Sequence, residues 1–380
     1  MLYLDYNATT PVAPEVFEAM RGALTEHFGN AHSAHAAGWW AKEAVEAARA
    51  DVASLVGAEA EEVVFTSGAT EASNLAIKGV LARYAPKGRH VVTVATEHAA
   101  VRETLEGLHR RGQAEVTVLP VDRDGRLAPA AFAAALRPDT VLAAVMWANN
   151  ETGVVHDMPA LYARARAAGV LFFTDATQAV GKVPVAFAHA DLLALSAHKL
   201  YGPKGVGALV VRRRGPRVAL APLVEGGGQE RGLRSGTLNV PGIVGLGAAA
   251  RLAGARLEGD GARLSALRDT LERRLVAEVG AVVNGAGAPR LPNTLSLTIP
   301  GVRAERLLSA LGGRLAFSTG SACASAKPEP SHVLVAMGLR EADARASIRL
   351  SLGRPTTEAD VAQAVQWVAE AVKLERAAGR

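Results

Sequence analysis

Short runs of β-branched and aliphatic residues alternate with helical stretches through the first half of the chain. Seven runs are expected to be strands: 63–66, 90–96, 116–119, 141–147, 170–174, 192–195 and 208–211. Parallel neighbours need long crossover connections, and the helical stretches between the runs supply them. The pattern therefore predicts an α/β fold with a mostly parallel seven-stranded sheet, covered on both faces, whose strand ends form one ligand-binding edge.

The remainder of the chain predicts a second, smaller unit. A chain of 380 residues is longer than a single core usually supports. The composition turns to Ala, Arg and Gly over 247–261, before a helix expected over 263–279. We predict an N-terminal segment (1–15) packing with the small domain, a large domain (16–255) and a small α+β domain (256–380). The small domain is expected to contain strands at 293–299 and 347–350, a helix at 304–311 and a last helix from 357.

Composition and charge exclude several classes of protein. Hydrophobic residues make up 49% and charged residues 21%, as in a globular enzyme. There is no run of about 18 uncharged apolar residues and no signal-peptide layout at the start, so we predict a cytoplasmic protein that makes no membrane contact. The net charge of +5 is scattered among 37 acidic residues, which argues against direct nucleic-acid binding. The single cysteine, Cys323, excludes an internal disulfide and a cysteine-rich zinc site, and no metal is predicted.

Lys199 is the first candidate catalytic residue. It follows the apolar run 192–195 together with Ser196 and His198, and a glycine-rich turn comes next. Low-dielectric walls disfavour the ammonium form and make the amine available for an imine. A lysine after a strand is more often a solvated surface charge, so the interpretation depends on what accompanies it.

Asp175 leaves the preceding strand, 170–174, one crossover earlier. A carboxylate held there can keep a heteroaromatic nitrogen protonated, and this makes pyridoxal phosphate an electron sink. Taken alone, Asp175 is equally well explained as a helix N-cap. The succession of strand, Asp, crossover, strand and His-Lys is much rarer.

A phosphate site is expected at 66–71, where a strand meets a helix and Ala69 and Thr70 lie in the first turn. Backbone N–H groups and hydroxyls are what a phosphate needs, although an ordinary helix cap has the same sequence signature. Ser196, His198 and the glycine-rich segment 226–237 could meet the same demand. The pair Gly181-Lys182 lacks the remaining residues of a phosphate loop.

Three further polar side chains follow predicted strands. His98 could stack on a flat cofactor ring and exchange protons near neutral pH, but a lone histidine is more often structural. Asn150 offers an amide for a carboxylate or ring oxygen. Arg349 could bind a carboxylate through two parallel hydrogen bonds, or it could be a surface arginine at a strand end.

Cys323 lies in a stretch of small, polar and proline residues, 318–332, without helical or strand periodicity. Such a loop can carry a nucleophile to a substrate and then to an acceptor. Only about 3% of an ordinary thiol is thiolate at pH 7, so local activation is needed. A buried inert cysteine is the usual alternative, and the polar neighbours argue against it.

Together, these residues resemble those of the cysteine desulfurases, members of the class V aminotransferase-like, fold type I pyridoxal-phosphate enzymes. The resemblance runs from 4–11 to 349–353, and its strongest motifs are 65–72, 226–237 and 318–323. It implies pyridoxal 5′-phosphate as cofactor and a homodimer.

The resemblance also implies roles for single residues. Lys199 would hold the cofactor as an imine, Asp175 would pair with the pyridine nitrogen, Gln178 would touch the ring hydroxyl and His98 would stack on the ring and assist proton transfer. The phosphate would be bound by Ala69, Thr70, Ser196 and His198, with Thr237 contributing across the dimer interface. Asn150 and Arg349 would hold the substrate carboxylate.

The implied reaction converts L-cysteine to L-alanine and leaves a persulfide on Cys323. Sulfur-acceptor proteins would take the persulfide for iron-sulfur cluster assembly or for thiolation of tRNA or cofactors. A selenocysteine lyase or an aminotransferase of the same fold is the alternative within this class. A catalytically idle scaffold that only binds sulfur-transfer partners is the alternative outside it.

Overall fold

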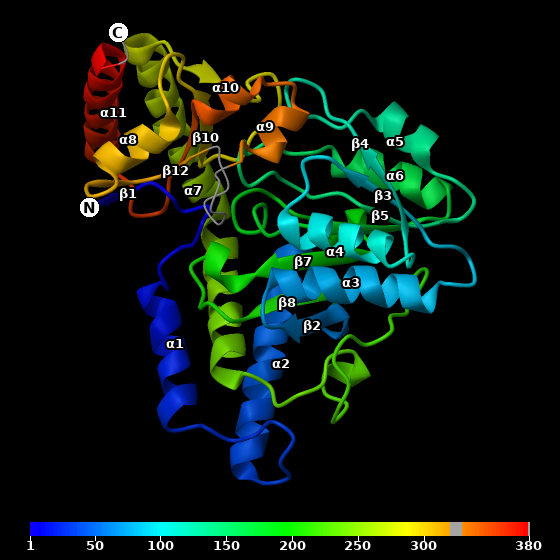
Figure 1. The fold of residues 1–380 in the computed structure, drawn as a ribbon. Coiled ribbons are helices and arrows are strands. Elements are labelled where there is room, and N and C mark those ends of the chain that lie inside the picture. Colours follow the sequence, from blue (N-terminus) through cyan, green and yellow to red (C-terminus); the bar gives the residue numbers. More distant parts are fainter. Residues whose placement is uncertain (320–328, 379–380) are drawn as a thin grey trace.

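The computed structural model describes residues 1–319 and 329–378. A seven-stranded sheet has the order β2-β8-β7-β6-β5-β3-β4, and β8 runs antiparallel to β2 and β7 while the other neighbours are parallel (Figure 1). The strands are β2 (Val63–Thr66), β3 (His90–Val94), β4 (Glu115–Leu119), β5 (Thr140–Ala144), β6 (Leu171–Asp175), β7 (Leu192–Ser196) and β8 (Gly207–Val211). The predicted mostly parallel sheet is confirmed.

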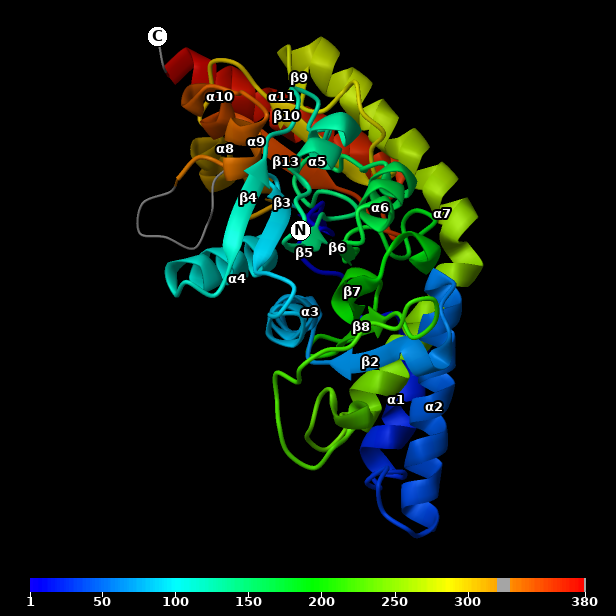
Figure 2. The same cartoon turned by 90° about the vertical axis from the view of Figure 1, so that its right-hand side faces the viewer.

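Six strands of this large sheet are buried almost throughout, whereas the edge strand β4 is partly exposed. Side chains alternate between the two faces along each strand, and each face packs against helices. Phe173 packs in one apolar cluster with α3 (Ala69–Arg83) and α4 (Ala99–Arg110). Phe172 belongs to the cluster on the other face. Figure 2 shows α3 and α4 on one side of the strands and α2 and α7 on the other. The remaining helices around the large sheet are α1 (Pro14–Thr25), α2 (Ala36–Val56), α5 (Pro129–Ala135) and α6 (Met158–Ala167).

A single helix, α7 (Val240–Val279, 40 residues), joins the large sheet to the remainder of the chain. The expectation that a helix begins at 263 was wrong, because the Ala-, Arg- and Gly-rich stretch 247–261 lies inside α7. Ala and Arg are good helix formers, and Gly247 lets α7 approach α2, since a Cβ there would lie 2.6 Å from the Cα of Ala48. Apolar residues of α7 up to Ala253 pack with the large sheet and those from Leu264 with the small one. The domain limit at 255 stays a proposal.

A small antiparallel sheet has the order β12-β13-β10-β9. Its strands are β9 (Val282–Val283), β10 (Thr294–Thr298), β12 (Ser318–Thr319) and β13 (Ser347–Ser351). The helices of this part are α8 (Ala304–Leu311), α9 (His332–Ala336), α10 (Glu341–Arg345) and α11 (Glu358–Ala378). Within the described residues, no helix combines the length and apolarity needed to cross a membrane.

The N-terminal segment runs from the small sheet to the large one. β1 (Leu2–Tyr3) pairs with β11 (Leu315–Ala316), and Leu4 is buried in the core of the small sheet. Asp5 then bridges to Ser351 of β13. Further along, the backbone N–H of Thr10 donates to the carbonyl of His198, 2.9 Å away, just after the end of β7. The segment therefore crosses the ligand-binding edge that the strand pattern predicts.

Candidate active site

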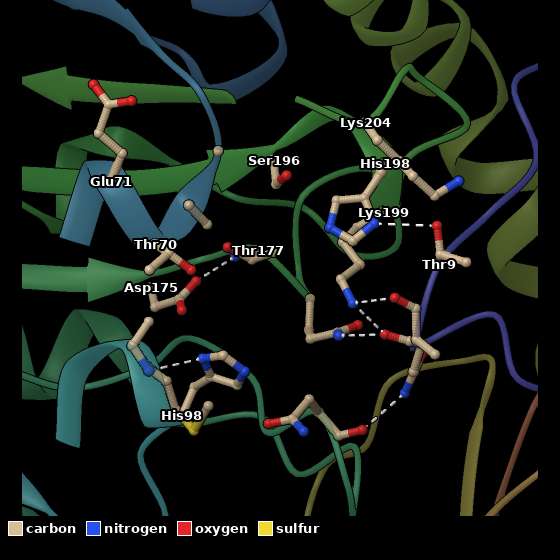
Figure 3. Close-up of a pocket in the computed structure, with 18 of the residues that line it drawn as sticks. Thr9, Thr70, Glu71, His98, Asp175, Thr177, Ser196, His198, Lys199 and Lys204 are labelled. Carbon is tan, nitrogen blue, oxygen red and sulfur yellow. Dashed lines mark hydrogen bonds between the residues drawn. The ribbon is translucent and has the colours of Figure 1, made fainter. Parts of the chain in front are cut away.

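A cavity of about 680 Å³ opens at the carboxyl ends of the large sheet's strands, and Figure 3 shows side chains converging on it. Its size lies in the usual range for a small-molecule site. Ten of the residues predicted from sequence line it: Ala69, Thr70, His98, Asn150, Asp175, Gln178, Ser196, His198, Lys199 and Arg349. The first nine lie beyond or at strand ends of the large sheet, whereas Arg349 comes from β13.

The Lys199 amine lies in the turn that follows β7. Its Nζ donates to the main-chain carbonyls of Asn7, at 2.5 Å, and Ala8, at 2.7 Å. Burial, followed by the positive charge of Arg349, lowers the pKa of Lys199 from 10.5 to about 8, although Asp175 and Asp5 partly offset this. A substantial fraction of the amine is therefore neutral near physiological pH and able to act as nucleophile or base.

Asp175 is the last residue of β6, and its buried carboxylate faces the cavity. Its Oδ1 accepts from the backbone N–H of Thr177 at 2.9 Å. Glu97 lies nearby but does not line the cavity, and burial together with the Asp175 charge raises the pKa of Glu97 well above its usual value. Burial thus favours the neutral form of Glu97, and Asp175 is the acidic side chain that lines the cavity.

The start of α3 forms an anion cradle. Gly68 at the N-cap has no side chain, so the first N–H groups of the helix stay free for a ligand, and Ala69 and Thr70 line the cavity beside Ser196. Gly207 permits this arrangement, because a Cβ on it would lie 2.8 Å from the Cα of Gly68. Backbone donors, hydroxyls and the helix dipole together suit a phosphate group.

His198 closes the cradle as a neutral side chain. Burial and the neighbouring charges of Lys199, Lys204 and Lys182 lower the pKa of His198 to about 4. Its Nδ1 lies 3.2 Å from Oγ1 of Thr9. Lys199 and His198 face Asp175, Thr70 and His98 across the cavity (Figure 3).

His98 caps α4, because its Nδ1 accepts from the backbone N–H of Ala100 at 3.1 Å. That acceptor role leaves Nε2 to carry the proton of a neutral imidazole. The exposed ring lines the cavity. It is therefore placed to contact a flat ligand and to exchange protons with it.

The Arg349 guanidinium reaches the cavity from the small sheet. Its Nη1 donates to the main-chain carbonyl of Asn150 at 3.1 Å, and its Nη2 donates to Oδ1 of Asp5 and to Oγ of Ser318, both at 2.7 Å. Nε is buried without a partner among residues 1–319 and 329–378. The expected pair of carboxylate-binding groups is thus brought together, with Asn150 contacting Arg349 through its backbone rather than its amide.

Three predicted site residues need separate comment. The side chain of Gln178 lines the cavity, but its Nε2 donates to the carbonyl of Asn7 at 3.0 Å and its Oε1 accepts from Lys182 at 2.7 Å. Thr237 is exposed and does not line the cavity. Cys323 lies outside the described residues, so its predicted function as nucleophile stays a prediction.

Sequence reasoning gave no function to several residues that the fold brings here. Asn7, Ala8, Thr9 and Lys204 line the cavity, and Glu97 lies behind it. The polar turn 7–10 belongs to the motif 4–11, which is part of the family resemblance. That resemblance was the only sign in the sequence that this turn has a function. A contact between Asn7 and Lys199, 192 residues apart, leaves no trace in local periodicity.

The chain is similar to proteins of a known family over nearly its whole length. The model of the family described as "Aminotransferase class-V" matches residues 2–364. A cysteine desulfurase IscS of Anaeromyxobacter dehalogenans (strain 2CP-C) is 53% identical over 379 residues, which cover 99% of this chain and 93% of that protein. A solved structure described as a NifS-like protein is 36% identical with a TM-score of 0.91, covering 98% of this chain and 99% of its own. A structure titled "SspA in complex with cysteine" is 35% identical with a TM-score of 0.82, covering 93% and 99%.

Proposed function

Since the chain belongs to the aminotransferase class-V family and is a cysteine desulfurase, we propose that it uses pyridoxal 5′-phosphate, held at Lys199, to transfer sulfur from L-cysteine to Cys323. One observation carries the proposal. Lys199, whose pKa is about 8, lies at the same cavity as the buried carboxylate of Asp175 and the N-terminus of α3. Arg349 reaches this cavity from the small sheet.

The residues present fit this cofactor. The α3 N-terminus, Thr70, Ser196 and neutral His198 would hold its phosphate, and Asp175 would pair with its ring nitrogen. When bound, the cofactor supplies an electrophilic aldehyde and a protonated ring that takes up electrons from the substrate α-carbon.

The remaining chemistry is performed by side chains of this chain. The Arg349 guanidinium binds the substrate carboxylate and fixes the orientation of the α-carbon. The neutral amine of Lys199, once free, takes the α proton. The Cys323 thiolate attacks the substrate sulfur, so that an S–S bond forms and the substrate's C–S bond breaks. The electron pair of the C–S bond stays with the β-carbon, which takes up a proton, and the α-carbon regains the proton that Lys199 removed. L-alanine then leaves, while the sulfur stays on the enzyme as a persulfide.

A homodimer is part of the proposal, with Thr237 directed to the partner's phosphate. The exposed apolar side chains of Phe28 and Trp39, which are 82% and 60% exposed, support a subunit contact on this side of the molecule. Trp39 lines a surface hollow together with Arg231, and Arg231 lies six residues before Thr237 in the sequence. Sedimentation equilibrium measures the mass directly, and a monomer at micromolar concentration would contradict this part.

The test of the cofactor assignment is chemical. Borohydride reduction of the cofactor-bound enzyme followed by peptide mapping should place the adduct on Lys199, and Lys199→Ala should give none. An adduct on another lysine would overturn the assignment.

The test of sulfur transfer uses the nucleophile. Cys323→Ser should bind cofactor and L-cysteine but release almost no sulfide. Near-normal desulfuration by this variant would show that Cys323 is not the nucleophile. Comparing the yields of alanine, sulfide and selenide separates a cysteine desulfurase from a selenocysteine lyase. Offering persulfide-loaded enzyme to candidate acceptors, such as iron-sulfur scaffold and thiolation proteins, identifies the acceptor.

A further inference from the structure

The side chain of Asn7 is anchored in both parts of the fold. Asn7 is 1% exposed, and its Nδ2 donates to Oγ1 of Thr294 on β10 at 2.9 Å and to the carbonyl of Asn150 at 3.1 Å. Its Oδ1 accepts from Nδ2 of Asn293 at 3.1 Å. A buried amide with both donors and its acceptor satisfied fixes the local main chain firmly.

The main chain that Asn7 fixes is the part that holds Lys199. The carbonyls of Asn7 and Ala8 accept from Nζ at 2.5 and 2.7 Å, as the dashed lines from Lys199 in Figure 3 show. The Asn7 carbonyl also accepts from Nε2 of Gln178. Two acceptors from adjacent residues thus define where the end of a flexible lysine side chain lies.

This pair of carbonyls can hold the Lys199 amine in its neutral form and leave its lone pair free. A neutral lysine amine has two N–H groups and one lone pair, and carbonyl oxygens can only accept. When both N–H groups of Lys199 are engaged by the carbonyls of Asn7 and Ala8, the lone pair remains available. A lysine whose pKa is about 8 spends a substantial fraction of its time in that form. The amine is therefore held as a ready base and does not have to search its rotamers.

We propose that Asn7 is a positioning residue for Lys199. Its side chain fixes the Asn7–Ala8 carbonyls, and these hold the free amine in place for transfer of the substrate α proton. The inference rests on the proposed function of Lys199, but it concerns only the state in which the amine is not bonded to the cofactor. Asn7 should therefore affect the proton-transfer step more than substrate binding.

The first test compares Asn7→Ala with Asn284→Ala in the cofactor-bound enzyme. Asn284 is a matched control, because it is 5% exposed, bonds to Ser296 and Thr298 in the small sheet, and does not line the cavity. Asn7→Ala should lower kcat by about tenfold to a hundredfold with little change in KM, as a small misplacement of a catalytic group does. The kinetic isotope effect on kcat with α-deuterated L-cysteine should rise. Asn284→Ala should leave the isotope effect unchanged.

The second test uses cofactor-free protein. Lys199 should capture added pyridoxal 5′-phosphate more slowly in Asn7→Ala than in Asn284→Ala. The rate of capture is measured from the appearance of the yellow absorbance. If Asn7→Ala does not fold, Thr294→Val replaces it, since valine keeps the shape of threonine and removes the hydroxyl that accepts from Nδ2 of Asn7 and donates to Oδ1 of Asn293. Its effects should be smaller and in the same direction.

The outcomes separate the two proposals. A borohydride adduct away from Lys199 defeats the proposed function itself. Suppose instead that the adduct lies on Lys199 and that a folded Asn7→Ala or Thr294→Val variant keeps the isotope effect, kcat and capture rate of the wild type. This result overturns only the positioning function of Asn7. A rise in KM at constant kcat would also contradict it, because it would place Asn7 in substrate binding.

Discussion

Nη2 of Arg349 lies 2.7 Å from Oδ1 of Asp5, so the arginine expected to bind the substrate carboxylate already has a carboxylate partner within the chain. Both side chains are largely buried, at 12% and 18% exposed. Arg349 lines the cavity and Asp5 does not. Asp5 therefore helps to fix the orientation of the guanidinium at the wall of the cavity.

Replacing Asp5 by Asn should weaken substrate binding. Asparagine keeps an oxygen for Nη2 of Arg349 but loses the charge, so an ion pair becomes a hydrogen bond from the guanidinium to an uncharged oxygen. We expect this change to cost about 1.4 kcal/mol, which corresponds to about tenfold. We expect KM for L-cysteine to rise by about that factor, with a smaller change in kcat. Asp343→Asn, in the more exposed pair with Arg340, is the matched control. Equal KM values in the two variants would contradict this function of Asp5.

Removing the Lys199 amine should stabilise the cofactor-free protein at neutral pH. The folded-state pKa of Lys199 is about 8 and the unfolded value is 10.5, so the unfolded chain binds more protons between these values. The resulting destabilisation, about 3 kcal/mol, is fully present below pH 8 and disappears as the pH rises to 10.5. Urea denaturation should show Lys199→Met to be more stable than wild type at pH 7 and equal to it near pH 10.5. Lys373→Met, at an exposed site, should show no such trend.

Glu97→Gln should be tolerated, because burial raises the pKa of Glu97 and favours its neutral form. Glutamine keeps an oxygen for the backbone N–H of Met146. Since burial and Asp175 raise the folded-state pKa of Glu97, the wild type loses stability as the pH rises above the unfolded value of 4.5. Thermal denaturation should therefore show Glu97→Gln to be at least as stable as wild type at pH 7, with the advantage lost below pH 4.5. Glu103→Gln, at an exposed position, is the control. If Glu97→Gln lost much more stability at pH 7 than this control, Glu97 would have to be ionised in the folded protein.

Glu230→Gln should destabilise the fold strongly. The Glu230 carboxylate accepts from Nη2 and Nη1 of Arg49 at 2.7 and 2.8 Å and from the backbone N–H of Phe65 at 2.7 Å, all buried. Removing the Glu230 charge leaves the buried guanidinium with only the half-exposed carboxylate of Glu46, 3.2 Å from Nε, as its charged partner. Loss of the buried partner of such a pair costs about 3–5 kcal/mol.

Urea denaturation measures this effect, with Glu18→Gln in the exposed Arg21–Glu18 pair as a control expected to lose less than about 1 kcal/mol. The double variant Arg49→Met/Glu230→Leu should be more stable than Glu230→Gln alone, because it leaves no unpaired charge. A single variant as mild as the control would show that the pair contributes little.

Much of the fold could be predicted from local pattern. Buried parallel strands are continuous apolar runs, and this gave the seven strands of the large sheet to within a few residues. Because parallel strands end at one edge, the pattern also predicted that Asp175, Ser196 and Lys199 would lie together, and they line one cavity. The start of α7 was misplaced, because a helix interior rich in Ala, Arg and Gly has the composition of a boundary.

The sequence by itself determined which segments are buried and which polar residues follow them, since burial and periodicity are properties of neighbouring residues. The tertiary structure alone decided which polar groups meet. The carbonyls of Asn7 and Ala8 hold Lys199, Asp5 holds Arg349 across 344 residues, and the Asn7 carbonyl accepts from Gln178 across 171 residues. Such pairings depend on how the N-terminal segment passes between two sheets, and hydrogen bonds between distant residues impose no period on the sequence that joins them.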